Sequence, residues 1–252
     1  MTLSRRQFTS LLGLTTLGGY ASVAYALSEK KEATHEEKEA TNDKKSVKAT
    51  TPVTDDDKIS YERLWIDLLA GNKRFVSGTP QARELIKTRQ ELVEGQHPRV
   101  IVLGCADSRV SPELVFDKNL GDLFVVRTAG NIADPIALGS IEYAVEHLHA
   151  SLLVVLGHEK CGAVAAAAAG GKMPTPNLEA IVKKITPALK PLQQGGASGD
   201  LLTSLGVEAN VRLSARDLVK NSEILRHELD AGKLTVIPAV YRLASGEVNR
   251  IG

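Results

Sequence analysis

The chain contains few aromatic residues and has no excess of either charge. Aromatic residues make up 4% of its 252 residues, and 31 basic against 30 acidic side chains give a formal net charge of +1. Surfaces that stack nucleic-acid bases need aromatic side chains, and surfaces that follow a phosphate backbone need clustered basic ones. Because the sequence offers little of either, we expect no nucleic-acid partner. With 43% hydrophobic residues, the chain can bury one sizeable core.

Cysteine is also scarce, and its two positions are Cys105 and Cys161. Taken alone, these residues could form a disulfide, remain as two inert buried thiols, or bind a metal ion. His158 precedes Cys161 by three positions, and a His-x-x-Cys pair on a turn can face one metal centre. The two cysteines by themselves leave all three interpretations open.

The first 26 residues have the features of an export signal. Arg5 and Arg6 precede a short, weakly apolar run that ends in Ala24-Tyr25-Ala26, a pattern typical of a signal-peptide cleavage site. The arginine pair, followed by Gln7 and Phe8, resembles a twin-arginine signal. We predict a cleaved signal peptide over residues 1–26 and a periplasmic or otherwise exported protein without stable membrane insertion. An N-terminal anchor that stays attached is the alternative.

Residues 27–58 are highly charged and contain almost no large apolar side chain. Residues 28–58 include nine acidic residues and seven lysines. Such a segment cannot bury enough apolar surface to offset the entropy lost on ordering, so we predict a disordered linker. The folded domain is therefore expected over residues 59–252.

The folded region alternates apolar strand-like runs with amphipathic helical patterns, which predicts an α/β fold with a mostly parallel sheet. Asp134 and Pro135 have the residue types that begin helices, and Gly170-Gly171 the type that ends them. Helices are expected over 60–78, 82–95, 134–150, 161–171, 177–192 and 202–232, strands over 99–105 and 151–158, a strand running into a loop over 122–131, and a strand, turn and return strand over 234–252.

Three possible metal ligands lie at the ends of two of these strands. Cys105 ends the first predicted strand, and His158 and Cys161 lie at the end of the third. Because ligands bind outside the carboxyl ends of parallel strands, these side chains would converge if the two strands are neighbours. Two thiolates and an imidazole suit zinc, and three protein ligands leave a fourth position open, as at catalytic zinc sites.

Two motifs and the segment between them resemble the β-class carbonic anhydrases. They are "CADSR" at 105–109 and "GHEKCGA" at 157–163, joined through "GDLFVVRTAGN" at 121–131. The resemblance spans about Ile59 to Gly252. It implies a zinc lyase with a parallel sheet, flanking helices and an extra edge strand, forming a homodimer or higher oligomer. Cys105, His158 and Cys161 would hold one zinc ion per subunit, and zinc-bound hydroxide would hydrate carbon dioxide reversibly to bicarbonate and a proton.

The same resemblance implies roles for three further residues. Asp107 would orient the hydroxide and Arg109 would hold Asp107, which in a closed state takes zinc's fourth position instead. Gln96 would contact substrate across the dimer. Some relatives have a tryptophan three residues before the first zinc cysteine, where this chain has Val102. We therefore predict that Asp107 stays paired with Arg109.

Two other functions fit the same residues. One is a hydrolase of carbon disulfide or carbonyl sulfide that uses the same zinc site. The other is a non-catalytic module that binds zinc or bicarbonate, against which the retained Asp107–Arg109 pair argues.

Overall fold

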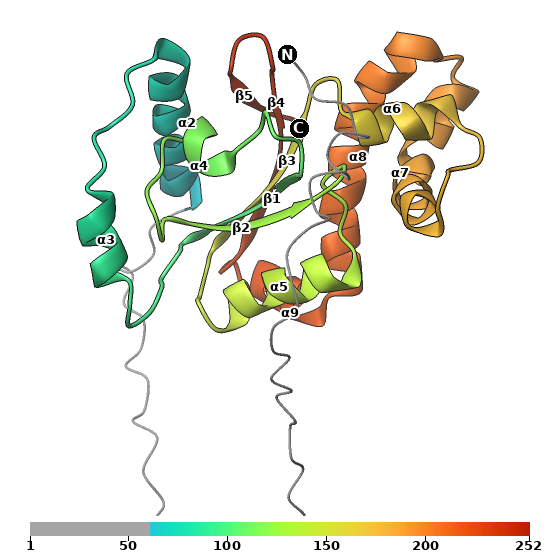
Figure 1. The fold of residues 1–252 in the computed structure, drawn as a ribbon. Helices are drawn as coiled ribbons and strands as arrows, with labels where there is room; N and C mark the ends of the chain where they lie inside the picture. Colours follow the sequence, from blue (N-terminus) through green and yellow to red (C-terminus); the bar gives the residue numbers. More distant parts are fainter. Residues whose placement is uncertain (1–60) are drawn as a thin grey trace, which may run out of the picture. The chain divides into compact units, whose positions relative to one another are not determined.

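The computed structural model describes residues 61–252, and these form the fold discussed below (Figure 1). The signal peptide predicted for residues 1–26 and the linker predicted for 27–58 lie outside the described residues. Within 61–252, no helix is both long enough and apolar enough to cross a membrane.

The centre of the fold is a five-stranded sheet in the order β2-β1-β3-β4-β5. The first four strands are parallel, and β5 pairs antiparallel with β4 at one edge, as the sequence predicted. Their bounds are β1 Val100–Cys105, β2 Leu123–Thr128, β3 Leu152–His158, β4 Thr235–Tyr241 and β5 Val248–Arg250.

Strands β1 and β3 lie inside the sheet and are buried at every residue. Both are continuous apolar runs, because side chains on both faces of a doubly covered sheet leave water. Ile101, Leu103 and Cys105 point into one core, and Val100 and Val102 into the other. This alternation places the Cys105 thiol on the same face as the helices that follow β3.

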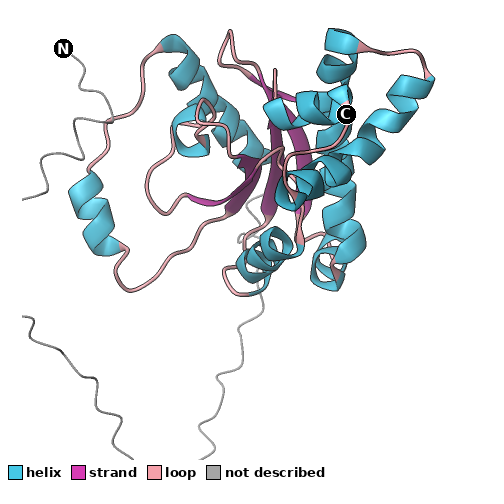
Figure 2. Cartoon of the chain, turned by 45° about the vertical axis from the view of Figure 1, so that its right-hand side comes forward, coloured by secondary structure: helices cyan, strands magenta, loops and turns pink. Residues whose placement is uncertain are grey.

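The helices cover the two faces unequally (Figures 1 and 2). One face packs against the helices that follow β2 and β3, and the other against the first described helix and a short helix after β1. The first group is α5 Pro135–Glu146, α6 Gly162–Ala169, α7 Pro176–Gln194, α8 Gly199–Asn221 and α9 Glu223–Asp230, and the remaining helices are α2 Tyr61–Ser77, α3 Leu85–Glu91 and α4 Pro112–Val115.

Local signals marked several helix ends correctly. The Asp134 side chain accepts the backbone N–H of Ala137 at the start of α5, and Gly170 ends α6 with φ +67°. The helix predicted over 202–232 is instead broken at Ser222, whose extended backbone ends α8 and whose hydroxyl accepts the N–H of Leu225. The helix predicted over 82–95 was too long, since α3 has only seven residues and none is buried.

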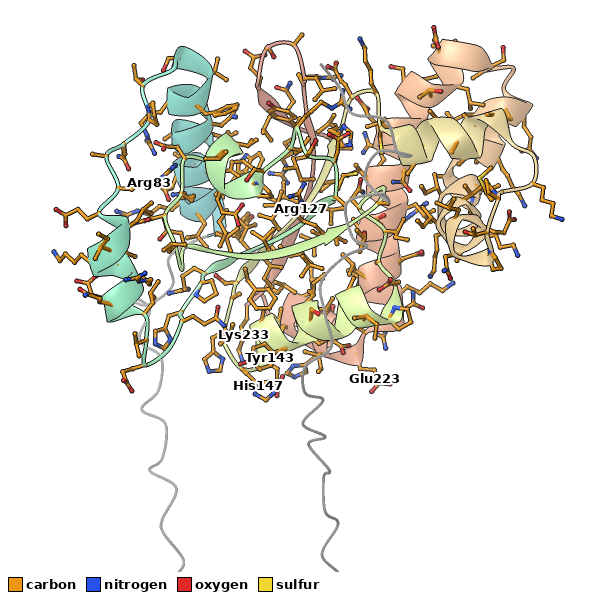
Figure 3. The ribbon with its side chains drawn as sticks, in the orientation of Figure 1. Arg83, Arg127, Tyr143, His147, Glu223 and Lys233 are labelled. Carbon is orange, nitrogen blue, oxygen red and sulfur yellow. The ribbon has the colours of Figure 1, made fainter. Side chains whose placement is uncertain are left out.

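A buried carboxylate, Asp117, lies just after α4 and binds both α2 and the chain segment that follows α2. It accepts hydrogen bonds from Arg74 Nε at 2.6 Å, Arg83 Nη2 at 2.8 Å and the backbone N–H of Gln81 at 3.0 Å. Its side chain is 1% exposed, and its backbone is in the left-handed region at φ +47°. Figure 3 shows Arg83 on the segment between α2 and α3, beside α2. The two arginines make burial of this charge tolerable.

We predict that the contacts of Asp117 with Arg74, Arg83 and Gln81 stabilise the fold at neutral pH but not in acid. Burial alone would raise the pKa of Asp117, but hydrogen bonds from Arg74 and Gln81 and the charge of Arg83 outweigh it and hold that pKa below its usual range. Stability from a depressed pKa is present above the unfolded-state pKa of about 4 and is lost as pH falls through the folded-state pKa. Asp117→Asn should lower the free energy of unfolding by about 2 kcal/mol at pH 5–8.

The difference in free energy of unfolding between the parent and Asp117→Asn, measured by chemical denaturation, should become smaller below about pH 4. Asp230→Asn, at an exposed position ending α9, should shift the free energy of unfolding by less than about 0.5 kcal/mol. If Asp117→Asn lowered the free energy of unfolding equally at every pH from about 3 to 8, the stabilising role assigned to the ionised Asp117 carboxylate would be contradicted.

Candidate metal centre

Cys105, His158 and Cys161 converge because the strands that end at the first two are neighbours. In the parallel pairing of β1 with β3, Gly104 lies opposite Leu156, so both strands end at the same edge of the sheet. Cys161 follows on the turn and precedes α6 in an extended conformation. The three ligand atoms lie within 4.8 Å of one another, and all three residues are buried.

The geometry of this cluster fits zinc. The two Sγ atoms are 4.0 Å apart and both thiols are free, which excludes the disulfide interpretation for this structure. Tetrahedral zinc with bonds of about 2.3 Å to sulfur separates two sulfurs by about 3.8 Å. His158 Nδ1 lies 2.8 Å from the carbonyl oxygen of Glu159, which can only accept, so Nδ1 carries the proton. Nε2 is then an acceptor, and it is buried without a hydrogen-bond partner, as a zinc ligand would be.

The surroundings of the two sulfurs favour negative charge at Cys105. A hydrogen bond from Cys161 lowers the pKa of Cys105 to about 4 against the effect of burial, and the N–H of Gly130 contributes at 3.3 Å. The same hydrogen bond, with burial, raises the pKa of Cys161 above its ordinary value. Burial opposes protonation of His158, but the negative charge favoured at the neighbouring Cys105 raises the pKa of His158. A cation at the centre would favour the thiolate form of both cysteines.

Asp107 and Arg109 form a two-point ion pair beside the cluster. Arg109 donates from Nε to Oδ1 at 2.9 Å, from Nη2 to Oδ2 at 2.7 Å and from its backbone N–H to Oδ1 at 3.0 Å. These hydrogen bonds hold the pKa of Asp107 well below its usual range, so it is a carboxylate at neutral pH. Asp107 Oδ2 also lies 3.8 Å from His158 Nε2. A fixed hydrogen-bond acceptor therefore stands next to the ligand atoms.

The sequence did not predict which residues hold the loops that follow β1 and β2. Arg127, at the end of β2, donates from Nε to the carbonyl of Cys105 at 2.9 Å and from Nη2 to that of Asp107 at 2.6 Å (Figure 3). Asn210, buried on α8, donates to the carbonyl of Gly130 at 2.8 Å. The only local signal for Arg127 was a charged residue closing an apolar strand. Asn210 had none, because its partner lies 80 residues away.

Gln96 is not brought to the metal ligands within one chain. It lies in an exposed loop four residues before β1, at the amino end of that strand. The ligands are at the carboxyl end, and a strand of six residues spans about 20 Å. A role for Gln96 at a metal centre therefore requires a second chain.

The sequence matches known carbonic anhydrases over most of the described region. Residues 100–248 match the family model described as carbonic anhydrase. Carbonic anhydrase 2 of Mycobacterium tuberculosis is 40% identical over 187 residues, which are 72% of this chain and 88% of that protein. The carbonic anhydrase of Synechococcus elongatus is 32% identical over 200 residues, 73% of this chain and 70% of that protein.

Solved structures agree with the sequence match. The β-carbonic anhydrase CcaA superposes with a TM-score of 0.61 at 27% identity, covering 76% of this chain and 91% of that one. A Coccomyxa β-carbonic anhydrase, solved in complex with acetazolamide, gives 0.59 at 26% identity, covering 75% and 82%. With its motifs assembled into one buried Cys-His-Cys cluster, the chain belongs to the carbonic anhydrase family, in the β class.

Proposed function

We propose that this protein is a lyase that catalyses the reversible hydration of carbon dioxide to bicarbonate and a proton, with one zinc ion per subunit on Cys105, His158 and Cys161. The observation that carries this function is the buried ligand cluster with an ionised Asp107 oxygen 3.8 Å from His158 Nε2. Bound zinc supplies Lewis-acid activation of water near neutral pH. This chemistry needs no nucleophilic side chain, so the remaining residues act by positioning.

Asp107 is the residue that positions the attacking water. Its carboxylate can only accept, so it takes a hydrogen bond from the water and leaves an oxygen lone pair free for the carbon of carbon dioxide. Arg109 holds both carboxylate oxygens in one plane, as a bidentate guanidinium does. This pairing keeps Asp107 available as an acceptor and opposes its direct binding to the metal, in line with Val102 in place of tryptophan.

We predict that Asp107→Ala separates catalysis from metal binding. The rate of carbon dioxide hydration should fall about 100- to 1,000-fold in stopped-flow measurements, the usual size of a lost positioning or proton-accepting group. Zinc content by atomic emission should stay near one per chain, because Asp107 is not among the three ligands. Asp230→Ala, at an exposed position far along the chain, should change neither value.

The same assay distinguishes the alternatives. A zinc-loaded parent without hydration activity would show a non-catalytic module. Faster release of sulfide from carbon disulfide or carbonyl sulfide than hydration of carbon dioxide would reassign the substrate.

We infer that the protein works as a homodimer or higher homo-oligomer. Large apolar side chains are exposed along the N-terminal region, among them Ile66 on α2, Ile86 on α3 and Val93 after α3. Strand β2 is half-buried and forms one edge of the sheet. Gln96 does not reach the metal centre of its own chain. A second copy that covers these apolar side chains would also bring its Gln96 near the metal centre of the first.

The proposed interface can be tested by measuring the sedimentation mass and the kinetics of two sets of variants. The parent should sediment as a dimer or larger multiple, and Ile66→Asp combined with Ile86→Asp should shift it toward the monomer, because buried carboxylates without partners are costly. Gln96→Ala should raise KM for carbon dioxide severalfold without changing the mass. A fully active monomeric parent would refute both the interface and the role of Gln96.

We propose that residues 1–26 direct export by the twin-arginine route, that 27–58 serve as a spacer and that the mature enzyme is periplasmic. Arg5-Arg6 and the Ala24-Tyr25-Ala26 site support this order. Arg5→Lys combined with Arg6→Lys should leave the protein in the cytoplasmic fraction of a bacterial host, whereas the parent should appear in the periplasm with Leu27 at its N-terminus. Unchanged export of the double variant would contradict this route.

A further inference from the structure

Glu159, the residue after the ligand His158, is held at four polar positions. Its N–H donates to the carbonyl of Tyr241 at 3.1 Å, and its own carbonyl accepts His158 Nδ1–H at 2.8 Å. Its side chain accepts the backbone N–H of Leu243 at Oε2, 3.0 Å away, and Arg242 Nη1 at Oε1, 3.1 Å away. The Glu159 carboxylate thus joins the turn after β3 to the turn after β4.

The carbonyl of Glu159 matters because it sets the direction of the imidazole. With Nδ1–H bound to that oxygen, Nε2 points toward the two sulfurs, and any tilt of the peptide would tilt the ring. The next residue, Lys160, has φ +51°, a conformation that side-chain-bearing residues seldom adopt. Local backbone preferences alone therefore do not hold this turn in its observed conformation. The anchored carboxylate of Glu159 provides an additional constraint.

The partner of Glu159 is itself fixed from two sides. The Arg242 backbone N–H donates to the carbonyl of Glu247, and its carbonyl accepts the N–H of Gly246, both at 2.8 Å, which closes the turn between β4 and β5. Its Nη2 also lies 3.6 Å from Glu208 Oε1 on α8. The clamp thus rests on the sheet edge and on a long core helix.

Partial exposure argues that this clamp contributes to position more than to stability. The side chains of Glu159 and Arg242 are 34% and 37% exposed. Ion pairs of this exposure stabilise a fold weakly because water screens them. The carbonyl they hold, in contrast, bonds to a fully buried ring, where small shifts change the donor geometry at the centre.

We propose that Glu159 is a positioning residue of the metal centre, whose carboxylate, clamped by Arg242 and the N–H of Leu243, fixes the carbonyl that aims His158 at zinc. The proposal rests on the zinc site of the proposed function. It assigns a role to a side chain that neither binds the metal nor touches substrate.

The test measures metal affinity, not activity. Zinc affinity is obtained by competition with a chromophoric chelator of known affinity at one fixed pH, for the parent and for Glu159→Ala. The variant should bind zinc about 10- to 100-fold more weakly, the usual effect of removing an outer-shell partner. Its cobalt-substituted form should show shifted visible absorption bands, because the imidazole enters the coordination sphere at a changed angle.

Glu159→Gln and a distant ion pair provide the controls. Glu159→Gln keeps an acceptor for Leu243 and should retain affinity closer to the parent, so it tests the proposal even if the alanine variant folds poorly. Glu228→Ala removes a glutamate that contacts His227 and Lys233, far along the chain from the ligands, and should leave zinc affinity and the cobalt spectrum unchanged.

The outcomes separate this proposal from the function beneath it. Zinc affinity of folded Glu159→Ala within twofold of the parent, with an unchanged cobalt spectrum, would overturn the positioning role and leave the zinc site intact. A parent that binds no zinc would overturn the proposed function first.

Discussion

The pairing of β1 with β3 is the constraint on which the rest of the site depends. These strands are separated by more than forty residues, yet their parallel register places Gly104 opposite Leu156 and ends both at one edge of the sheet. A slip of one residue would turn Cys105 to the opposite face, away from α6 and Cys161. Both strands are buried on both faces, and their alternate side chains pack into two different cores. A slip of one residue would therefore move every side chain from one core into the other and disrupt the packing of both.

The second requirement is control of charge in a buried place. Two sulfurs that must become thiolates and a carboxylate lie close together, an arrangement that would be unfavourable without opposing groups. The chain supplies those groups locally, as the N–H of Gly130 on Cys105 and the two-point contact of Arg109 on Asp107. The arrangement leaves a net demand for a cation, which zinc meets.

The loops that carry the functional residues are short, and their geometry is set by partners elsewhere in the fold. Arg127 on β2 holds the loop after β1, and Asn210 on α8 holds the loop after β2. The clamp between Glu159 and Arg242 holds the turn after β3. Rigid elements thereby position residues that must point within a fraction of an ångström, which loops alone do not achieve.

The sequence by itself determined the strands, most helices and the three candidate zinc ligands, because these depend on local patterns: continuous apolar runs, the Asp134 cap, Gly170 and two short motifs. It did not determine the roles of Arg127 and Asn210, which depend on contacts between residues 22 and 80 positions apart. The helix break at Ser222 had only the local signal of one capping serine, which the helical patterns on both sides outweighed. Only the tertiary structure decided which strands are neighbours, since period and propensity report one segment at a time and strand order follows from packing the whole core.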